Sequence, residues 1–231
     1  MIVSNINIEV EYKKIKNIHL AVYPPDARVH VSAPEYISED DLRAYILTKT
    51  DWISQQQKEI LEQERETRRE YISGENHYLF GKRYILRVIE EDTSPKIMKD
   101  NKYLKMYVRP GATREKRQEV LYEYYRTQLH EKLTELFPKW KELTGEDDFS
   151  WKILAMKTQW GSCMQKKREI RMNLALARVP VECIEYIIVH EIAHLKVRLH
   201  DKLFNALVTK YMPDWKKIRQ QLNGFISVPL V

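Results

Sequence analysis

Two histidines and a glutamate stand close together in a segment that is otherwise almost entirely apolar. They form the pattern HExxH, with His190, Glu191 and His194. The apolar residues of positions 179–199 cover nearly every side of a helical wheel, which predicts a buried helix. Burying two imidazoles and a carboxylate is costly unless a partner satisfies them, and a divalent metal does so directly. The alternative is a core helix whose two histidines are satisfied by the protein.

The spacing of the three residues predicts different roles for them. Histidines four positions apart lie on one face of a helix, so His190 and His194 can reach one ion. Glu191 is rotated by about 100° from His190. We therefore expect its carboxylate to activate a water molecule as a general base and not to bind the metal.

His200 is the candidate for a third ligand. On a continued helix it would point about 120° away from His194, so the helix must stop near Arg198 or Leu199. Asp201 is a suitable N-cap for a second helix, and a break between the two helices would turn His200 back towards the metal. The alternative is a helix-capping or surface histidine.

Several motifs occur in an order that resembles a known family. They are QWGSC at 159–163, IRMNL at 170–174, HEIAH at 190–194 and HDKLF at 200–204, preceded by VHVSAP at 29–34 and DWI at 51–53. The set resembles the YgjP-like metallopeptidase domain, a relative of the SprT-like and WLM zinc peptidases. The resemblance implies zinc (Zn²⁺) held by His190, His194 and His200, with Glu191 as catalytic base. Asn205 departs from the family, which often has tryptophan there.

The remaining chain predicts an α+β fold. We expect a small antiparallel meander over residues 6–34, one helix from Ser38 past Trp52, strands at 79–89 and 103–108, and an amphipathic helix over 113–137. Two strands, 151–159 and 168–175, then precede the metal helix, which begins after Pro180. This predicts a β-rich N-terminal subdomain with one long helix at 1–100, and a zincin-like, metal-binding catalytic subdomain with a short sheet and the HExxH helix at 101–231.

Candidates for substrate contact surround the QWGSC motif. The strand at 170–174 is the expected edge strand for an extended peptide, with a purely structural strand as the alternative. We expect substrate-binding roles for Trp160, Gly161, Ser162 and Asn173, although Trp160 also suits a core position and Gly161 a simple turn. Candidate stabilisers of a developing oxyanion are Tyr186, Tyr211 and Ser162.

The positive charge lies in the C-terminal part. Residues 151–231 contain 14 Lys and Arg against 6 Asp and Glu, a net charge of +8, whereas the whole chain carries +6. Basic surface near a metal favours an anionic partner such as an acidic peptide, a nucleotide or nucleic acid. The nearest candidates are Lys166, Lys167, Arg168 and Arg171, with a solvated basic turn as the alternative.

The sequence contains no apolar run long enough for a membrane span, so no membrane partner is expected. The N-terminus has neither the basic region nor the apolar core of a signal peptide. The two cysteines, Cys163 and Cys183, form no disulfide framework, which favours a cytoplasmic location. Cys183 is two helical turns, about 10 Å, from His190 and cannot share its metal. For Cys163 we expect a free, buried thiol, with a position nearer the metal as the alternative.

These observations predict a zinc-dependent metallohydrolase, most simply a metallopeptidase acting on a peptide. One alternative is a nucleoside triphosphate pyrophosphatase acting on a nucleotide, an activity that the resemblance also brings with it. Another is a nucleic-acid-associated module with structural zinc. The intact Glu191 argues against the last, because a structural zinc site needs no base.

Overall fold

The computed structural model describes residues 1–23, 26–62 and 69–225. The chain divides into two compact units, Met1–Arg65 and Glu66–Val231. Each unit has its own hydrophobic core, and the two cores share no residue. The helices in the described ranges are all too short or too polar to cross a membrane.

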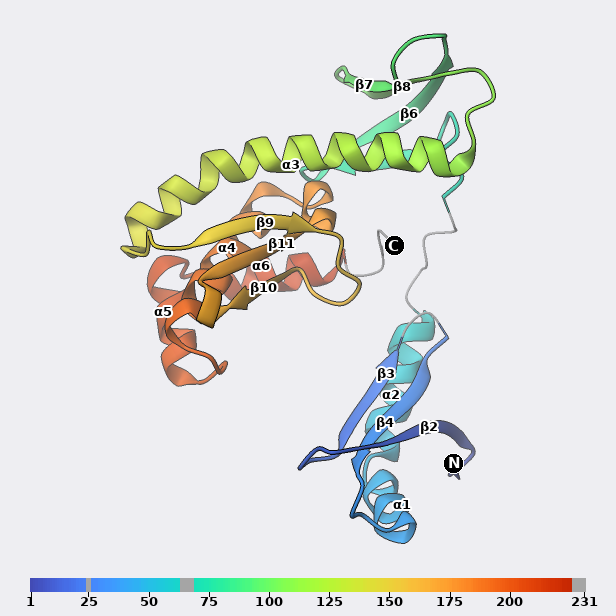
Figure 1. Ribbon diagram of the computed structural model, residues 1–231, viewed down its shortest axis with the longest axis vertical. Helices are drawn as coiled ribbons and strands as arrows, with labels where there is room; N and C mark the ends of the chain where they lie inside the picture. Colours follow the sequence, from blue (N-terminus) through green and yellow to red (C-terminus); the bar gives the residue numbers. More distant parts are fainter. Residues whose placement is uncertain (24–25, 63–68, 226–231) are drawn as a thin grey trace. The chain divides into compact units, whose positions relative to one another are not determined.

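The first unit contains a four-stranded sheet with two helices (Figure 1). The sheet has the order β1-β2-β4-β3, from β1 (Ile2–Val3), β2 (Ile6–Lys13), β3 (His19–Tyr23) and β4 (Arg28–Pro34). β2 runs parallel to β4, so the expected antiparallel meander is wrong. The reason is the burial of β4, because its Val29, Val31 and Ala33 are fully buried. β4 therefore lies inside the sheet, between β2 and β3.

Ser38 begins a helix as predicted, because its hydroxyl accepts a hydrogen bond from the Asp41 backbone N–H at 3.1 Å. The single helix expected here is, however, two helices. α1 (Glu39–Leu47) has Thr48 as its C-cap, and α2 (Thr50–Glu62) carries Trp52. The hydroxyls of Thr48 and Thr50 donate hydrogen bonds to backbone carbonyls three residues earlier. Such side-chain hydrogen bonds compete with those of the helix backbone and favour a break.

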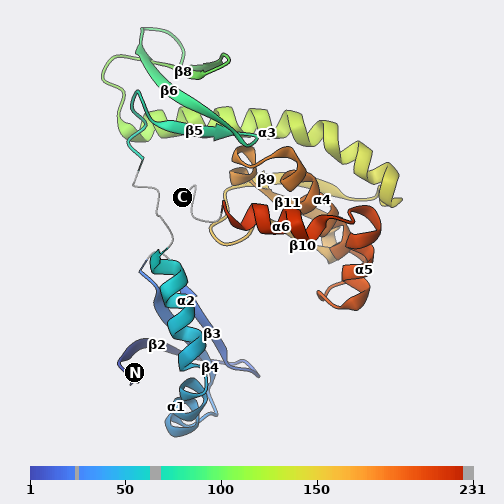
Figure 2. The ribbon, with the colours of Figure 1, turned by 180° about the vertical axis from the view of Figure 1, so that it is seen from behind.

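The second unit contains a long helix between two sheets (Figures 1 and 2). One sheet has the order β5-β6-β8-β7, from β5 (Asn76–Leu79), β6 (Lys82–Glu90), β7 (Lys96–Lys99) and β8 (Tyr103–Val108). The helix is α3 (Arg114–Thr144), and its predicted apolar stripe is buried at Leu121, Tyr125, Leu129, Leu133 and Phe137.

On the other side of α3 lies a three-stranded sheet of order β10-β11-β9, from β9 (Ser150–Leu154), β10 (Gly161–Met164) and β11 (Glu169–Asn173). A 3₁₀ turn, η2 (Leu174–Arg178), leads into α4 (Val181–Lys196), which is followed by α5 (Lys202–Tyr211) and α6 (Trp215–Asn223). The prediction of a mixed α+β protein agrees with this arrangement.

The division of the chain differs from the expected one near residue 100. The sheet β5–β8 belongs to the same unit as α4, because the turn between β5 and β6 binds the segment before that helix. Phe80 and Gly81 donate their backbone N–H groups to the carbonyls of Ala177 and Arg178, at 2.8 and 3.1 Å. Gly81 has φ +78°, and a Cβ there would lie 2.7 Å from Cγ of Pro180, so only glycine fits this contact.

Candidate metal centre

His190, Glu191 and His194 all lie on α4, the helix that the apolar pattern predicts. The helix ends at Lys196, and Val197 is extended, with φ −126° and ψ 118°. The predicted break is therefore present, two residues before Arg198. Asp201 caps α5 by accepting a hydrogen bond from the Phe204 backbone N–H at 3.0 Å. The turn between the two helices returns His200 to the face of α4 that carries the other two histidines.

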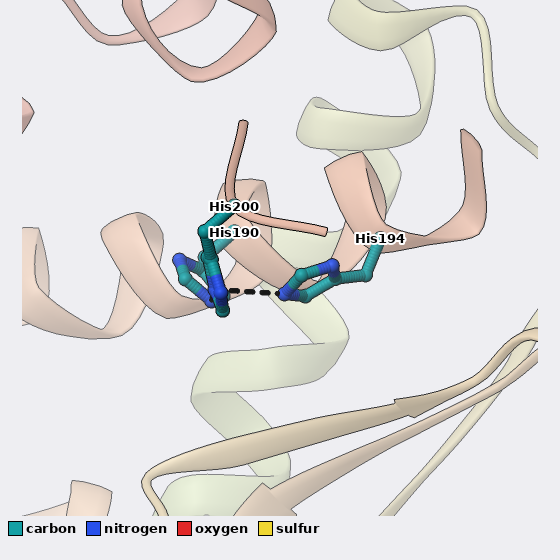
Figure 3. Close-up of side chains that lie close together, drawn as sticks. All are labelled: His190, His194 and His200. Atoms are coloured by element: carbon teal, nitrogen blue, oxygen red, sulfur yellow. Dashed lines mark hydrogen bonds between the residues drawn. The ribbon is translucent and has the colours of Figure 1, made fainter. Parts of the chain in front are cut away.

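The three imidazoles point their Nε2 atoms at one another (Figure 3). The Nε2 atom of His200 lies 3.1 Å from that of His194 and 3.1 Å from that of His190. Nitrogen ligands about 2.0–2.1 Å from a tetrahedral zinc lie roughly 3.4 Å apart. The arrangement therefore needs only a small expansion to hold such an ion.

Hydrogen bonding alone does not satisfy this cluster. Nδ1 of His194 lies 2.9 Å from the Val197 carbonyl oxygen, which only accepts, so the proton sits on Nδ1 and Nε2 keeps its lone pair. A single N–H on Nε2 of His200 can point at one of its two neighbours but not at both. A cation between the three Nε2 atoms accepts all three lone pairs, so the residues present fit a metal ion.

The protonation state of the cluster also suits a metal. Burial, with a smaller contribution from the neighbouring His194 and His200, lowers the pKa of His190 to about 3. Burial likewise lowers the pKa of His194. Neutral imidazole is the form that binds metals. The ring of Phe204 packs between 4.5 and 4.9 Å from all three imidazole centres and restricts their rotation.

Glu191 is buried beside the histidines, with 4% of its surface exposed. Burial raises the pKa of its carboxyl group to about 8. Its side chain lies against the backbone of Gly161, where an added Cβ would be 2.7 Å from Oε1. A carboxyl group in this position can gain and lose a proton near neutral pH.

These residues line one pocket of about 760 Å³. Its walls come from β10 and the residues before it, from α4, from the turn that carries His200, and from α6. The three histidines and Glu191 lie together in this pocket, which is open to solvent and is large enough for part of a peptide or a small molecule.

The chain resembles one family of known proteins over most of its length. The family model of the YgjP-like metallopeptidase domain matches residues 16–225. The chain belongs to this family. It is therefore a metallopeptidase-type hydrolase, and the family implies a metal ion, for which the three histidines are suitable ligands.

One solved structure with detectable similarity is that of the metallopeptidase zymogen of Pyrococcus abyssi abylysin. It is 25% identical, with a TM-score of 0.37, and the match covers 39% of this chain and 90% of that one. No curated protein matches the chain.

Within this YgjP-like chain, the predicted substrate residues separate into two groups. Trp160, Gly161 and Ser162 line the pocket. Asn173 does not, because it is buried and its amide donates to the carbonyls of Met156 and Gln159, at 2.9 and 2.6 Å. Instead of contacting substrate, Asn173 holds the segment that leads into β10.

The expected edge strand is also different. β11, which contains residues 170–173, lies in the middle of its sheet, between β9 and β10. The edge strand beside the metal pocket is β10, which pairs only with β11 among the described strands. The sequence predicted two strands here, whereas the structure has three. β9 pairs with one edge of β11 in parallel, and β10 pairs with its other edge.

The positive residues of the pocket differ from the expected four. Of those four, Lys166 alone lines it, and Lys167, Arg168 and Arg171 do not. Arg168 pairs with Glu146 at 2.8 Å and Arg171 with Glu169 at 2.9 Å. Arg198 and Arg219 line it as well, and no acidic group in the described part of the chain pairs with either. A signal for Arg219 existed in the sequence, because it shares a helical face with the buried Trp215 and Leu222.

The remaining candidates also have definite places. Tyr186 and Ser162 line the pocket, whereas Tyr211 donates its hydroxyl to the Thr144 carbonyl at 3.4 Å and does not. Cys163 is free and lines the pocket, half-buried on β10. Burial, with a contribution from Glu191, raises the pKa of its thiol to about 11. Cys163 is therefore a protonated and unreactive thiol at neutral pH.

Proposed function

We propose that this chain is a zinc-dependent peptidase in which His190, His194 and His200 hold the metal and Glu191 is the general base. The observation that carries the proposal is the convergence of three Nε2 atoms beside a buried carboxyl group in an open pocket. A site that held zinc only for structure would close around it and would have no use for Glu191.

When bound, zinc supplies Lewis acidity, which makes water more acidic and polarises the carbonyl group under attack. Glu191 takes the proton from the attacking water and passes it to the leaving nitrogen. Burial raises the pKa of its carboxyl group, which favours taking a proton from water.

The edge of β10 supports the choice of a peptide as substrate. An extended peptide can add to an unpaired strand edge through backbone hydrogen bonds. β10 contributes Gly161, Ser162, Cys163 and Met164 to the pocket, and in the described part of the chain its other edge pairs with no strand. A peptide on this edge would lie next to the histidines, with Tyr186 and Ser162 as the available groups for a developing oxyanion.

A second candidate, hydrolysis of a nucleoside triphosphate, is favoured by a different observation. Lys166, Arg198 and Arg219 bring three cations to the pocket, and no acidic group in the described residues pairs with them. Such a pocket attracts anions, whether phosphates or acidic side chains. The cations are compatible with the peptidase as well, if its substrates are acidic.

The decisive experiment compares peptide and nucleotide hydrolysis by the zinc-loaded protein and by Glu191→Gln. The amide cannot accept a proton from water, so we expect retained zinc and a loss of activity on the order of 100-fold or more. Pyrophosphate or phosphate release without peptide cleavage would replace the peptidase by the second candidate. Full activity of Glu191→Gln would refute the assignment of the base.

A further inference from the structure

The sheet β5–β8 has one face in the core and one that no described element of the second unit covers. Its inward residues, among them Leu79, Leu86, Leu104 and Met106, are buried against α3 and its neighbours. The alternate positions point the other way and are absent from that core. We call this outward side the tyrosine face.

Aromatic and basic side chains make up most of the tyrosine face. It carries three tyrosines, Tyr78, Tyr103 and Tyr107, and four cations, Arg83, Arg87, Lys96 and Lys105. The other outward positions of the four strands are Asn76, Ile85, Ile89 and Met98, so no strand places a carboxylate there. The net charge of residues 1–150 as a whole does not reveal this local excess of positive charge.

The cations stand next to the rings and are mostly unpaired. Lys105 forms an ion pair with Asp100 at 2.9 Å, but no acidic group in the described residues pairs with Arg83, Arg87 or Lys96. The guanidinium carbon of Arg87 lies 4.4 Å from the centre of the Tyr103 ring. The ammonium nitrogen of Lys96 lies 5.4 Å from the centre of the Tyr107 ring.

We propose that the tyrosine face binds single-stranded nucleic acid. Proteins that bind such strands combine a positive surface along the backbone with aromatic rings or guanidinium planes on which bases stack. Here Tyr103 and Tyr107 each have a cation beside the ring. A base can therefore stack at the same place where its phosphate meets a positive charge. Tyr103 and Tyr107 are about 13 Å apart along β8, which leaves each ring room for an unstacked base.

The positive charge of the tyrosine face favours single-stranded nucleic acid over other partners. Three cations without an acidic partner, together with Lys105, which pairs with Asp100, fit a polyanion, whereas a protein partner of ordinary composition would bring both signs of charge. Duplex nucleic acid offers the same phosphates but keeps its bases stacked inside, so the rings would find no partner. Neither contact involves the sugar, and we expect RNA and DNA strands to bind alike.

Binding at this face is separate from hydrolysis. The face is turned away from α3, and the metal pocket belongs to elements on the other side of that helix (Figures 1 and 2). The inference therefore does not rest on the proposed function. A bound strand would anchor the enzyme at nucleic acid without occupying its active pocket.

The charge part of the proposal is tested by fluorescence anisotropy on the full-length protein. The probes are labelled single strands of mixed sequence, RNA and DNA, roughly 20 nucleotides long to exceed a typical site. Arg83→Glu with Arg87→Glu should weaken binding by more than about tenfold and flatten its salt dependence, since each phosphate contact contributes a slope of about 0.7. Lys14→Glu with Lys16→Glu changes the charge equally on exposed residues of the first unit and should weaken binding less than about twofold.

The stacking part is tested by Tyr103→Ala and Tyr107→Ala, with the phenylalanine variants as controls. Each alanine should weaken binding by roughly tenfold without changing the salt slope, whereas phenylalanine keeps the ring and should retain affinity. Thermal unfolding checks that every variant is folded, and hydrolysis by all of them should equal that of the unchanged protein.

Four results with the nucleic-acid probes would overturn the proposal. They are no binding by the unchanged protein at low salt, equal weakening by the Lys14 and Lys16 control, equally tight binding of a duplex of the same sequence, and unchanged affinity in folded alanine variants. An acidic polypeptide that binds more tightly than the strands and competes with them would assign the face to a protein partner and would also reject it.

Discussion

At the scale of single residues, the centre depends on three imidazoles from two different segments. His190 and His194 come from one helix, and their spacing of four residues places both on the same face of it. His200 reaches them only because α4 ends at Lys196 and α5 begins at Lys202. The site can therefore be tested one residue at a time.

His200→Ala should reduce zinc affinity by about 100-fold or more, because the ion loses one of three nitrogen ligands. Zinc titration against a competing chelator measures this loss. His19→Ala, which removes an exposed histidine of the first unit, serves as the control and should leave affinity unchanged. Equal affinity in His200→Ala would show that the third ligand is elsewhere.

Gly161→Ala should slow hydrolysis while zinc stays bound. The new Cβ would lie 2.7 Å from Oε1 of Glu191 and 2.8 Å from Cγ2 of Ile187, so the base must move. A displacement of about 1 Å in an active site costs on the order of 100-fold in rate. Steady-state kinetics should show the loss in kcat rather than KM.

Gly224→Ala is the matched control for Gly161→Ala. At Gly224 φ is −64°, and the nearest atom to an added Cβ is the Gln221 carbonyl oxygen at 3.2 Å. Its activity should remain close to that of the unchanged protein. If Gly161→Ala kept full kcat, the contact with Glu191 would have no role in placing the base.

At the scale of elements, the capping of α5 decides where His200 lies. The side chain of Asp201 accepts from the Phe204 backbone N–H, and Phe204 packs against all three imidazoles. The cap, the third ligand and the ring that restricts the histidines therefore form one short segment.

Asp201→Ala should lower the free energy of unfolding by about 1 kcal/mol, the usual effect of removing an N-cap side chain. Urea unfolding of the metal-free protein measures it. Asp214→Ala is the control, because Asp214 precedes α6 without a side-chain capping hydrogen bond, and we expect a change of only a few tenths of a kcal/mol. Equal effects of the two variants would contradict the capping role of Asp201.

At the scale of the whole molecule, the chain consists of two units, and the residues of the metal pocket all come from the second. All residues of the metal pocket, its cations and the tyrosine face belong to Glu66–Val231. The core of this unit contains no residue of the first one.

A fragment of residues 66–231 should therefore fold and bind one zinc ion. Cooperative thermal unfolding and zinc stoichiometry measure both properties, with the full chain as reference. Because each unit buries its own apolar residues, the fragment loses no core contact. An unfolded fragment would show that the second unit depends on the first.

Local patterns in the sequence were sufficient for much of the site. The apolar wheel around His190 and Glu191 predicted a buried helix, and the angle between His194 and His200 required that helix to stop. The four-residue repeat of Leu121, Tyr125 and Leu129 likewise predicted α3. These features follow from helical geometry and capping, which act over a few neighbouring residues.

Other features depended on residues far apart in the chain. The place of β10 at the sheet edge, the parallel pairing of β2 with β4 and the inward position of Asn173 follow from strand order, which periodicity does not encode. Arg219 reaches the pocket from α6, and the tyrosine face forms only when β6, β7 and β8 lie side by side. Pairing of distant segments, set by which surfaces bury most apolar area together, decided these contacts.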